Sequence, residues 1–119
     1  MVQNSGKKYD LKDRTFLFTK NVIIYIDTLP RSLTNIEIGE QLLRSAGSVG
    51  INYIEASESL SKKDFLMHIK IFQKEAKETL YWLNLSTPDK EYLDTKAQLI
   101  HESTELMKIF AAIIRNSRI

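Results

Sequence analysis

The sequence predicts an all-α protein that folds as an antiparallel up-down-up-down four-helix bundle. Apolar residues recur every three or four positions along four long segments, which is the period of an amphipathic helix. Short breaks containing Pro30, Ser61 and Pro88 separate these segments, and none of the segments alternates as a strand would. Because short connections join antiparallel neighbours, we expect residues 10–119 to form one four-helix bundle domain and residues 1–9 to form a flexible N-terminal arm.

The first two helices are predicted from their apolar stripes and their flanking residues. Asp10 is the expected N-cap of the first helix, which ends before Pro30. Its core face comprises Leu11, Phe18, Val22, Tyr25, Ile26 and Leu29. Thr34 or Asn35 is expected to cap the second helix. The core face of this helix comprises Ile38, Leu42, Val49, Tyr53, Ala56 and Leu60.

The last two helices also carry start signals. Ser61 and Asp64 have the spacing of a capping box at the start of the third helix, and Thr87 is expected to cap the fourth helix with Pro88 in its first turn. The stripe of the third helix is Phe65, Ile69, Phe72, Ala76, Leu80 and Leu83. The inner face of the fourth is Leu93, Leu99, Ile100, Leu106, Met107, Phe110, Ile113 and Ile114.

Three glycines interrupt the second segment, at positions 39, 47 and 50. A glycine inside a helix costs about 0.5–1 kcal/mol relative to alanine, so three of them require an explanation. We expect close packing against a neighbouring helix in preference to a local irregularity.

Composition narrows the classes of function. The chain has no cysteine, which excludes disulfides, thiolate metal sites and a cysteine nucleophile and fits a cytoplasmic location. No segment reaches the roughly 18 unbroken apolar residues of a membrane span, so no membrane contact is expected. The formal net charge of +2 is too small to indicate nucleic-acid binding by itself, so any basic surface must be local.

A polar stripe along the second helix is the most distinctive feature of the sequence. Within about a quarter-turn it contains Gln41, Arg44, Ser48, Asn52, Glu55 and Ser59. Most other positions of this helix are apolar or small, so we expect the helix to be buried and the stripe to be satisfied inside the protein. Glu75 and Glu78 of the third helix are positioned to meet Arg44 and Asn52, and this network would fix helix register. If Arg44 and Glu55 were buried and paired, losing either would cost about 3–5 kcal/mol.

A metal or acid-base role for Glu55, Glu75 and Glu78 is the weaker alternative. Carboxylate-bridged di-metal bundles use Glu-x-x-His, and neither His68 nor His101 has a glutamate three residues before it. Ser45 and Ser48 have no histidine base at a recognisable spacing. We therefore expect no catalytic residues, no metal and no cofactor, and we assign the histidines no role.

Two surfaces indicate binding partners. Lys63, Lys70, Lys74 and Lys77 share a narrow sector of the third helix with Tyr81 at its end, and we call this row the lysine rail. It predicts binding to nucleic-acid phosphates, although a solvated face that maintains solubility has the same pattern. On the first helix, the surplus apolar residues Phe16, Leu17, Ile23 and Ile24 predict a subunit interface.

The runs RSAGSVGINYIEASESLSKKDF and IKIFQKEAKETLYWLNL resemble a bacterial four-helix-bundle family first associated with intervening sequences in large ribosomal RNA genes. The resemblance extends from about Asp10 into the fourth helix. Its markers are Gln41, Arg44, Ser45, Ser48, Asn52, Glu55, Ala56, Phe65, Lys74, Glu75, Glu78 and Trp82. Ile51 stands where alanine is common in the family, which affects only local packing.

This resemblance implies a small cytoplasmic protein without established enzymatic activity that assembles as a ring-like homo-oligomer, namely a pentamer. A related branch implies RNA or DNA as a partner, together with a reverse transcriptase or another protein, because its members serve as accessory proteins of diversity-generating retroelements. We therefore expect a non-enzymatic oligomeric adaptor that binds RNA or DNA weakly through the backbone. The alternative is a structural or protein-protein interaction module without nucleic-acid binding.

Overall fold

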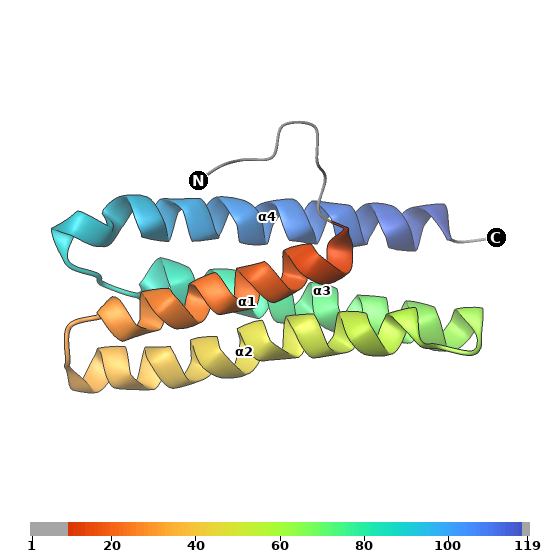
Figure 1. Cartoon of the computed structure of the whole chain (residues 1–119). Coiled ribbons are helices and arrows are strands. Elements are labelled where there is room, and N and C mark those ends of the chain that lie inside the picture. Colours follow the sequence, from red (N-terminus) through yellow and green to blue (C-terminus); the bar gives the residue numbers. More distant parts are fainter. Residues whose placement is uncertain (1–9, 118–119) are drawn as a thin grey trace.

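The computed structural model describes residues 10–117, and four long helices make up most of this region. They are α1 (Leu11–Thr28), α2 (Leu33–Ser57), α3 (Lys62–Leu85) and α4 (Leu93–Asn116), with a single 3-10 turn, η1 (Lys90–Tyr92), before α4. The helices lie side by side and alternate in direction (Figure 1). The predicted all-α antiparallel four-helix bundle is confirmed, and no strand occurs among residues 10–117. The predicted N-terminal arm at residues 1–9 lies outside the described residues.

Side-chain caps begin the first three helices. Asp10 Oδ1 accepts a hydrogen bond from the Asp13 amide at 2.9 Å, and Ser61 Oγ accepts one from the Asp64 amide at 3.0 Å, so both predicted caps are confirmed. The predicted cap of α2 at Thr34 or Asn35 was wrong, because Ser32 Oγ accepts from the Asn35 amide at 3.0 Å. Ser32 lies two residues after Pro30, and its extended backbone suits an N-cap, so α2 begins at Leu33.

Asn35 and Thr87 connect two loops at one end of the bundle instead of capping helices. The Asn35 amide donates to the Pro30 carbonyl at 3.0 Å and to the Thr87 carbonyl at 3.4 Å, and the Thr87 hydroxyl donates to Asn35 Oδ1 at 3.3 Å. The predicted start of the fourth helix at Thr87 and Pro88 was therefore wrong. The chain remains extended at Asp89, forms η1, and enters α4 only at Leu93.

The core runs along the bundle axis and uses the predicted stripes with small changes. Its centre is Phe72, whose ring lies against Tyr53 of α2 and Phe110 of α4. The buried apolar residues are Phe18, Val22, Tyr25, Ile38, Leu42, Ala46, Val49, Ala56, Ile69, Phe72, Ala76, Leu83, Leu99, Leu106, Phe110 and Ile114. The prediction that Leu60 belongs to this core was wrong, because α2 ends at Ser57 and leaves Leu60 fully exposed in the turn. Leu93 is also exposed, at the first turn of α4.

Two of the three glycines lie where α2 packs against α1. A Cβ atom at Gly39 would lie 3.2 Å from Ile26 Cγ2, and one at Gly50 would lie 3.5 Å from Thr19 Oγ1. Thr19 also donates a hydrogen bond to the Ala46 carbonyl at 2.7 Å, which holds the two backbones together. A contact of 3.5 Å is an ordinary van der Waals distance, and a Cβ atom at Gly47 would meet nothing within 4 Å, so close packing explains Gly39 but neither Gly47 nor Gly50.

The expectation that α2 is buried around its circumference was wrong. Its core face is covered, but five large apolar residues of this helix are exposed: Leu33, Ile36, Leu43, Ile51 and Ile54. In a bundle of four helices each helix keeps one side turned away from the core, and no element among residues 10–117 covers that side of α2. The surplus apolar sequence of α2 is therefore a surface feature.

The four seams between neighbouring helices are unequal. Contacts are most extensive between α2 and α3 and sparsest between α1 and α4. A groove of about 830 Å³ follows the α1/α4 seam, where Arg14 makes a two-point ion pair with Glu102 at 2.6 and 2.8 Å. The hydrogen bonds that Arg14 donates to Glu102 are the main reason that the pKa of Arg14 is raised above its ordinary value. Across residues 10–117, no helix combines the length and hydropathy needed to cross a bilayer.

Candidate nucleic-acid interface and the adjoining polar cluster

The lysine rail lies on the outward face of α3. Ile69, Phe72 and Ala76 fix the opposite face in the core, so helical geometry turns the rail residues Lys63, Lys70, Lys74 and Lys77, with Tyr81, toward solvent, and all five are exposed. Within the described part of the chain, none of the four lysines has a carboxylate oxygen within 4.0 Å. Four charges in one row without internal partners are available to an external anion.

Apolar side chains flank the rail, and sequence reasoning missed them. Met67 and Leu85 are about half exposed on the same side of α3, and a shallow pocket of about 480 Å³ between Lys63 and Lys70 is lined partly by Leu66 and Met67. At the other end the Tyr81 ring packs edge-on against Trp82, with the centroids 5.0 Å apart. The helical period placed Met67 and Leu85 near the rail, but only the structure shows that nothing in the described part of the chain covers them.

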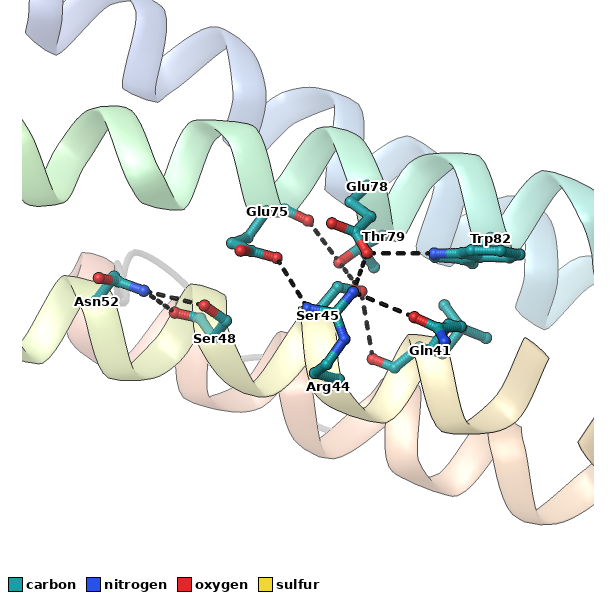
Figure 2. Close-up of polar contacts among 10 residues, drawn as sticks. Gln41, Arg44, Ser45, Ser48, Asn52, Glu75, Glu78, Thr79 and Trp82 are labelled. Atoms are coloured by element: carbon teal, nitrogen blue, oxygen red, sulfur yellow. Dashed lines mark hydrogen bonds and ion pairs between the residues drawn. The ribbon is translucent and has the colours of Figure 1, made fainter. Parts of the chain in front are cut away.

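The predicted polar network divides into two groups along the α2/α3 seam. In the first, shown in Figure 2, Arg44 reaches from α2 to α3 and its Nη2 contacts Glu78. The same nitrogen donates to Gln41 Oε1 at 3.1 Å, and Nη1 lies 4.0 Å from Glu75 Oε1. The Trp82 indole nitrogen lies 3.4 Å from Glu78 Oε2. Arg44 therefore places one positive charge against two carboxylates.

The second group surrounds His68, to which sequence reasoning gave no role. Asn52 Nδ2 donates to Ser48 Oγ and to the Ser48 carbonyl at 3.0 and 2.9 Å, while Asn52 Oδ1 lies 3.3 Å from His68 Nδ1. The same nitrogen is 3.6 Å from Glu55, and Nε2 of the ring is 3.7 Å from Asp64. The four-residue spacing of Asp64 and His68 on one helix was the signal that could have found this cluster.

The expectation that the stripe is satisfied inside the protein was wrong for its charged members. The side chains of Arg44 and Glu55 are each 55% exposed, and the two are not paired. Eleven residues separate them along α2, an axial distance of about 16 Å, which no salt bridge can span. The stripe lies at the solvent edge of the seam, so removing Arg44 alone should cost much less than about 3 kcal/mol.

The buried polar contacts between α2 and α3 involve Thr79. Its hydroxyl lies 2.8 Å both from Ser45 Oγ and from the Glu75 carbonyl, deep in the seam. Glu75 itself is only 13% exposed, and its Oε1 is a buried oxygen without a hydrogen-bond partner. Ser45 and Thr79 thus contribute to helix register, while Arg44 supplies the nearest compensating charge for Glu75.

The weaker metal hypothesis receives no geometric support in the described region. Glu75 and Glu78 converge on Arg44, whereas Glu55 lies in the separate group around His68. Among residues 10–117, no three acidic or histidine side chains converge in a way that could hold a metal ion. On this side of the bundle the exposed lysine rail is the feature that can attract an anion by charge.

The four surplus apolar residues of α1 border two different grooves. Phe16 is 67% exposed and lines a largely apolar groove of about 420 Å³ with Gly47, Gly50, Ile51 and Ile54 of α2. Leu17 and Ile24 line the α1/α4 groove instead, and Ile23 is exposed near Phe16 on the helix face. The residues predicted for a subunit contact are therefore accessible, but they do not form a single patch.

Comparison with known proteins places this bundle in a family. The model of the family described as 23S rRNA-intervening sequence protein matches residues 7–112. A crystal structure of a protein of unknown function from the S23 ribosomal protein family of Bacteroides thetaiotaomicron VPI-5482 is 32% identical, with a TM-score of 0.71. The match covers 87% of this chain and 96% of the other. No curated protein matches. With the family model covering most of its length and a similar bundle in a relative, the chain belongs to the 23S rRNA-intervening sequence protein family.

Proposed function

We propose that this protein is a non-enzymatic, homo-oligomeric adaptor that binds the backbone of RNA or DNA weakly through the lysine rail. The observation that carries the proposal is the row of four exposed lysines on α3, which have no ion-pair partner among residues 10–117. Membership of a family described by an rRNA intervening sequence supports nucleic acid as the polyanion. No feature of the described residues indicates a reaction.

The expected binding is electrostatic and insensitive to sequence. Lysine contacts to phosphate carry no base information, and Tyr81 offers one exposed ring for stacking. Four phosphate contacts give a slope of log affinity against log salt of roughly −3 on single strands and −3.5 on duplex. Assembly into a ring, for which a pentamer is our proposal, would add the weak contacts of several protomers on one nucleic acid.

The experiment compares two variants that lose equal charge. In the rail variant Lys70, Lys74 and Lys77 become glutamine, and in the control variant Lys20, Lys90 and Lys108 do, which are exposed lysines outside α3. Both keep side-chain length and helix propensity. Affinity for a single-stranded RNA of mixed sequence is measured between 50 and 200 mM salt, together with circular dichroism and molar mass.

The rail variant should bind every sequence more weakly, with a shallower salt slope, while the control variant retains most of the affinity and slope of the wild type. Equal losses in the two variants would mean that net charge alone, and not the rail, attracts the RNA. Absence of RNA and DNA binding by the wild type at about 50 mM salt would overturn the proposal.

A structural or protein-protein interaction module is the second candidate, and a specific observation favours it. The outward faces of α1 and α2 expose Phe16, Ile51 and Ile54 around a groove whose floor contains Gly47 and Gly50. Exposed apolar surface of this kind marks protein contacts more often than nucleic-acid contacts. This candidate becomes the leading one if the lysine experiment fails.

A further inference from the structure

A carboxylate stands directly beside the lysine rail. Glu78 follows Lys74 by one helical turn, and side chains four residues apart on a helix lie about 5–6 Å from one another at Cβ. Glu75 precedes Glu78 by three residues on the same flank of α3. Left alone, these two negative charges would oppose phosphate binding, and Glu78 would be free to pair with Lys74.

Arg44 of α2 prevents this arrangement in the structure. Its guanidinium contacts Glu78, faces Glu75 at 4.0 Å and is held by Gln41 at 3.1 Å, as Figure 2 shows. Gln41 in turn donates to Glu37 at 3.1 Å, which fixes the amide that orients Arg44. Within the described residues Arg44 is the only basic side chain within 4.0 Å of either glutamate.

We propose that Arg44 is a positioning residue for nucleic-acid binding, which keeps Lys74 free by engaging Glu78 and neutralises the flank of the rail. Arg44 itself lies across the seam on α2 and acts through the two glutamates. The inference rests on the proposed function, since it concerns the charge that the rail presents to a phosphate backbone. A purely structural role for the Arg44 cluster predicts altered stability without any change in salt-dependent binding.

The first test replaces Arg44 by glutamine and compares this variant with one that loses an ion-paired arginine elsewhere in the bundle. Arg14→Gln is the control, because Arg14 also makes a two-point contact with a carboxylate, Glu102, but on the α1/α4 seam away from the rail. Single-stranded RNA binding should weaken about three- to tenfold at 50 mM salt in Arg44→Gln, with a slope shallower by about 0.7. Arg14→Gln should leave affinity and slope near those of the wild type.

Rescue separates an electrostatic role from a structural one. In the double variant Arg44→Gln with Glu78→Gln, affinity and slope should return toward the wild-type values, because the carboxylate that competes for Lys74 is gone. Glu78→Gln alone frees the charge of Arg44 beside the rail and should bind about two- to fivefold more tightly. This single variant keeps the test decisive if Arg44→Gln does not fold.

Each outcome bears on a different claim. If the wild type binds RNA but Arg44→Gln binds equally well, or if Glu78→Gln neither rescues nor strengthens binding, the inference fails and the proposed function stands. If the wild type does not bind RNA or DNA at 50 mM salt, the proposed function fails and this inference fails with it.

Discussion

Tyr25 shows how a single polar atom is accommodated in the core. The residue is fully buried, and its hydroxyl lies 2.6 Å from Ser86 Oγ, which also lies 2.7 Å from the Leu83 carbonyl. Burial raises the pKa of Tyr25 above its ordinary value, and the hydrogen bond with Ser86 offsets part of that rise. Burial also raises the pKa of Tyr53. The folded protein thus favours the neutral form of both side chains.

The raised pKa of Tyr25 predicts a loss of stability at alkaline pH. Below the ordinary tyrosine pKa of about 10 the stabilisation is fully present, and it declines as pH rises from there through the pKa of the folded state, because only the unfolded chain ionises freely. Tyr25→Phe should cost about 1 kcal/mol at pH 7 through the lost hydrogen bond but should flatten the decline above pH 10. Tyr53 should retain part of the decline.

Urea unfolding between pH 7 and pH 11 measures this effect, with the exposed Tyr81→Phe as a control. An equally steep alkaline decline in Tyr25→Phe and in the wild type would show that Tyr25 does not contribute to it.

At the scale of the helix, α2 combines a covered and an open side. Gly39 and Gly50 face α1 at close range, whereas the space beside Gly47 is open. Close packing therefore compensates the cost of a helical glycine at Gly39, whereas a methyl group would make only an ordinary contact at Gly50 and none at Gly47.

Replacing these glycines by alanine should have different effects along the same helix. Gly47→Ala should stabilise the protein by about 0.5–1 kcal/mol, because the gain in helix propensity meets no steric cost. Gly39→Ala should stabilise the protein less or destabilise it, because the Ile26 side chain would have to shift to make room for the added methyl group. Thermal and urea denaturation of both variants at low micromolar concentration provides the measurement. If Gly47→Ala is less stable than the wild type, this would indicate that a partner covers position 47. A lower molar mass of the variant would then show that assembly is lost.

The whole molecule exposes more apolar surface than its own fold can use. The surface includes the groove beside Phe16, the outward face of α2 and the residues along the α1/α4 seam. Two separate grooves on one protomer, one largely apolar beside Phe16 and one of mixed lining along the α1/α4 seam, suit a head-to-tail contact, in which different faces of neighbouring copies meet and a ring closes. This geometry motivates the proposed homo-oligomer.

Light scattering at micromolar concentration should give a molar mass well above the 13.8 kDa of one chain, and close to five times that value for the proposed pentamer. Phe16→Asp and Ile51→Asp should each lower the mass, since a charge in an apolar contact is costly to bury. Leu33→Asp is the control, because Leu33 is exposed at the start of α2 and lines neither groove. A wild-type mass of one chain would contradict the proposed assembly and the contribution of several protomers to binding.

The sequence by itself determined the number of helices, their core stripes and the family. Helical periodicity, Asp10, Ser61 and Pro30 are local signals, and local signals report helices reliably because each turn depends on residues three or four positions apart. The row of lysines on one face of α3 followed from the same periodicity. Helix geometry also shows that Arg44 and Glu55 lie too far apart along α2 to pair with each other.

Only the tertiary structure decided which side of each helix is covered. Asn35 and Thr87 are good cap residues, but both take part in the contact between two loops. Ser32 caps α2 instead, and η1 precedes α4. Arg44 is exposed and paired with Glu78 because α2 and α3 pack with the polar stripe at the solvent edge of their seam. Burial depends on the relative rotation and spacing of helices distant in sequence, and the periodicity of one helix does not specify where its neighbours lie.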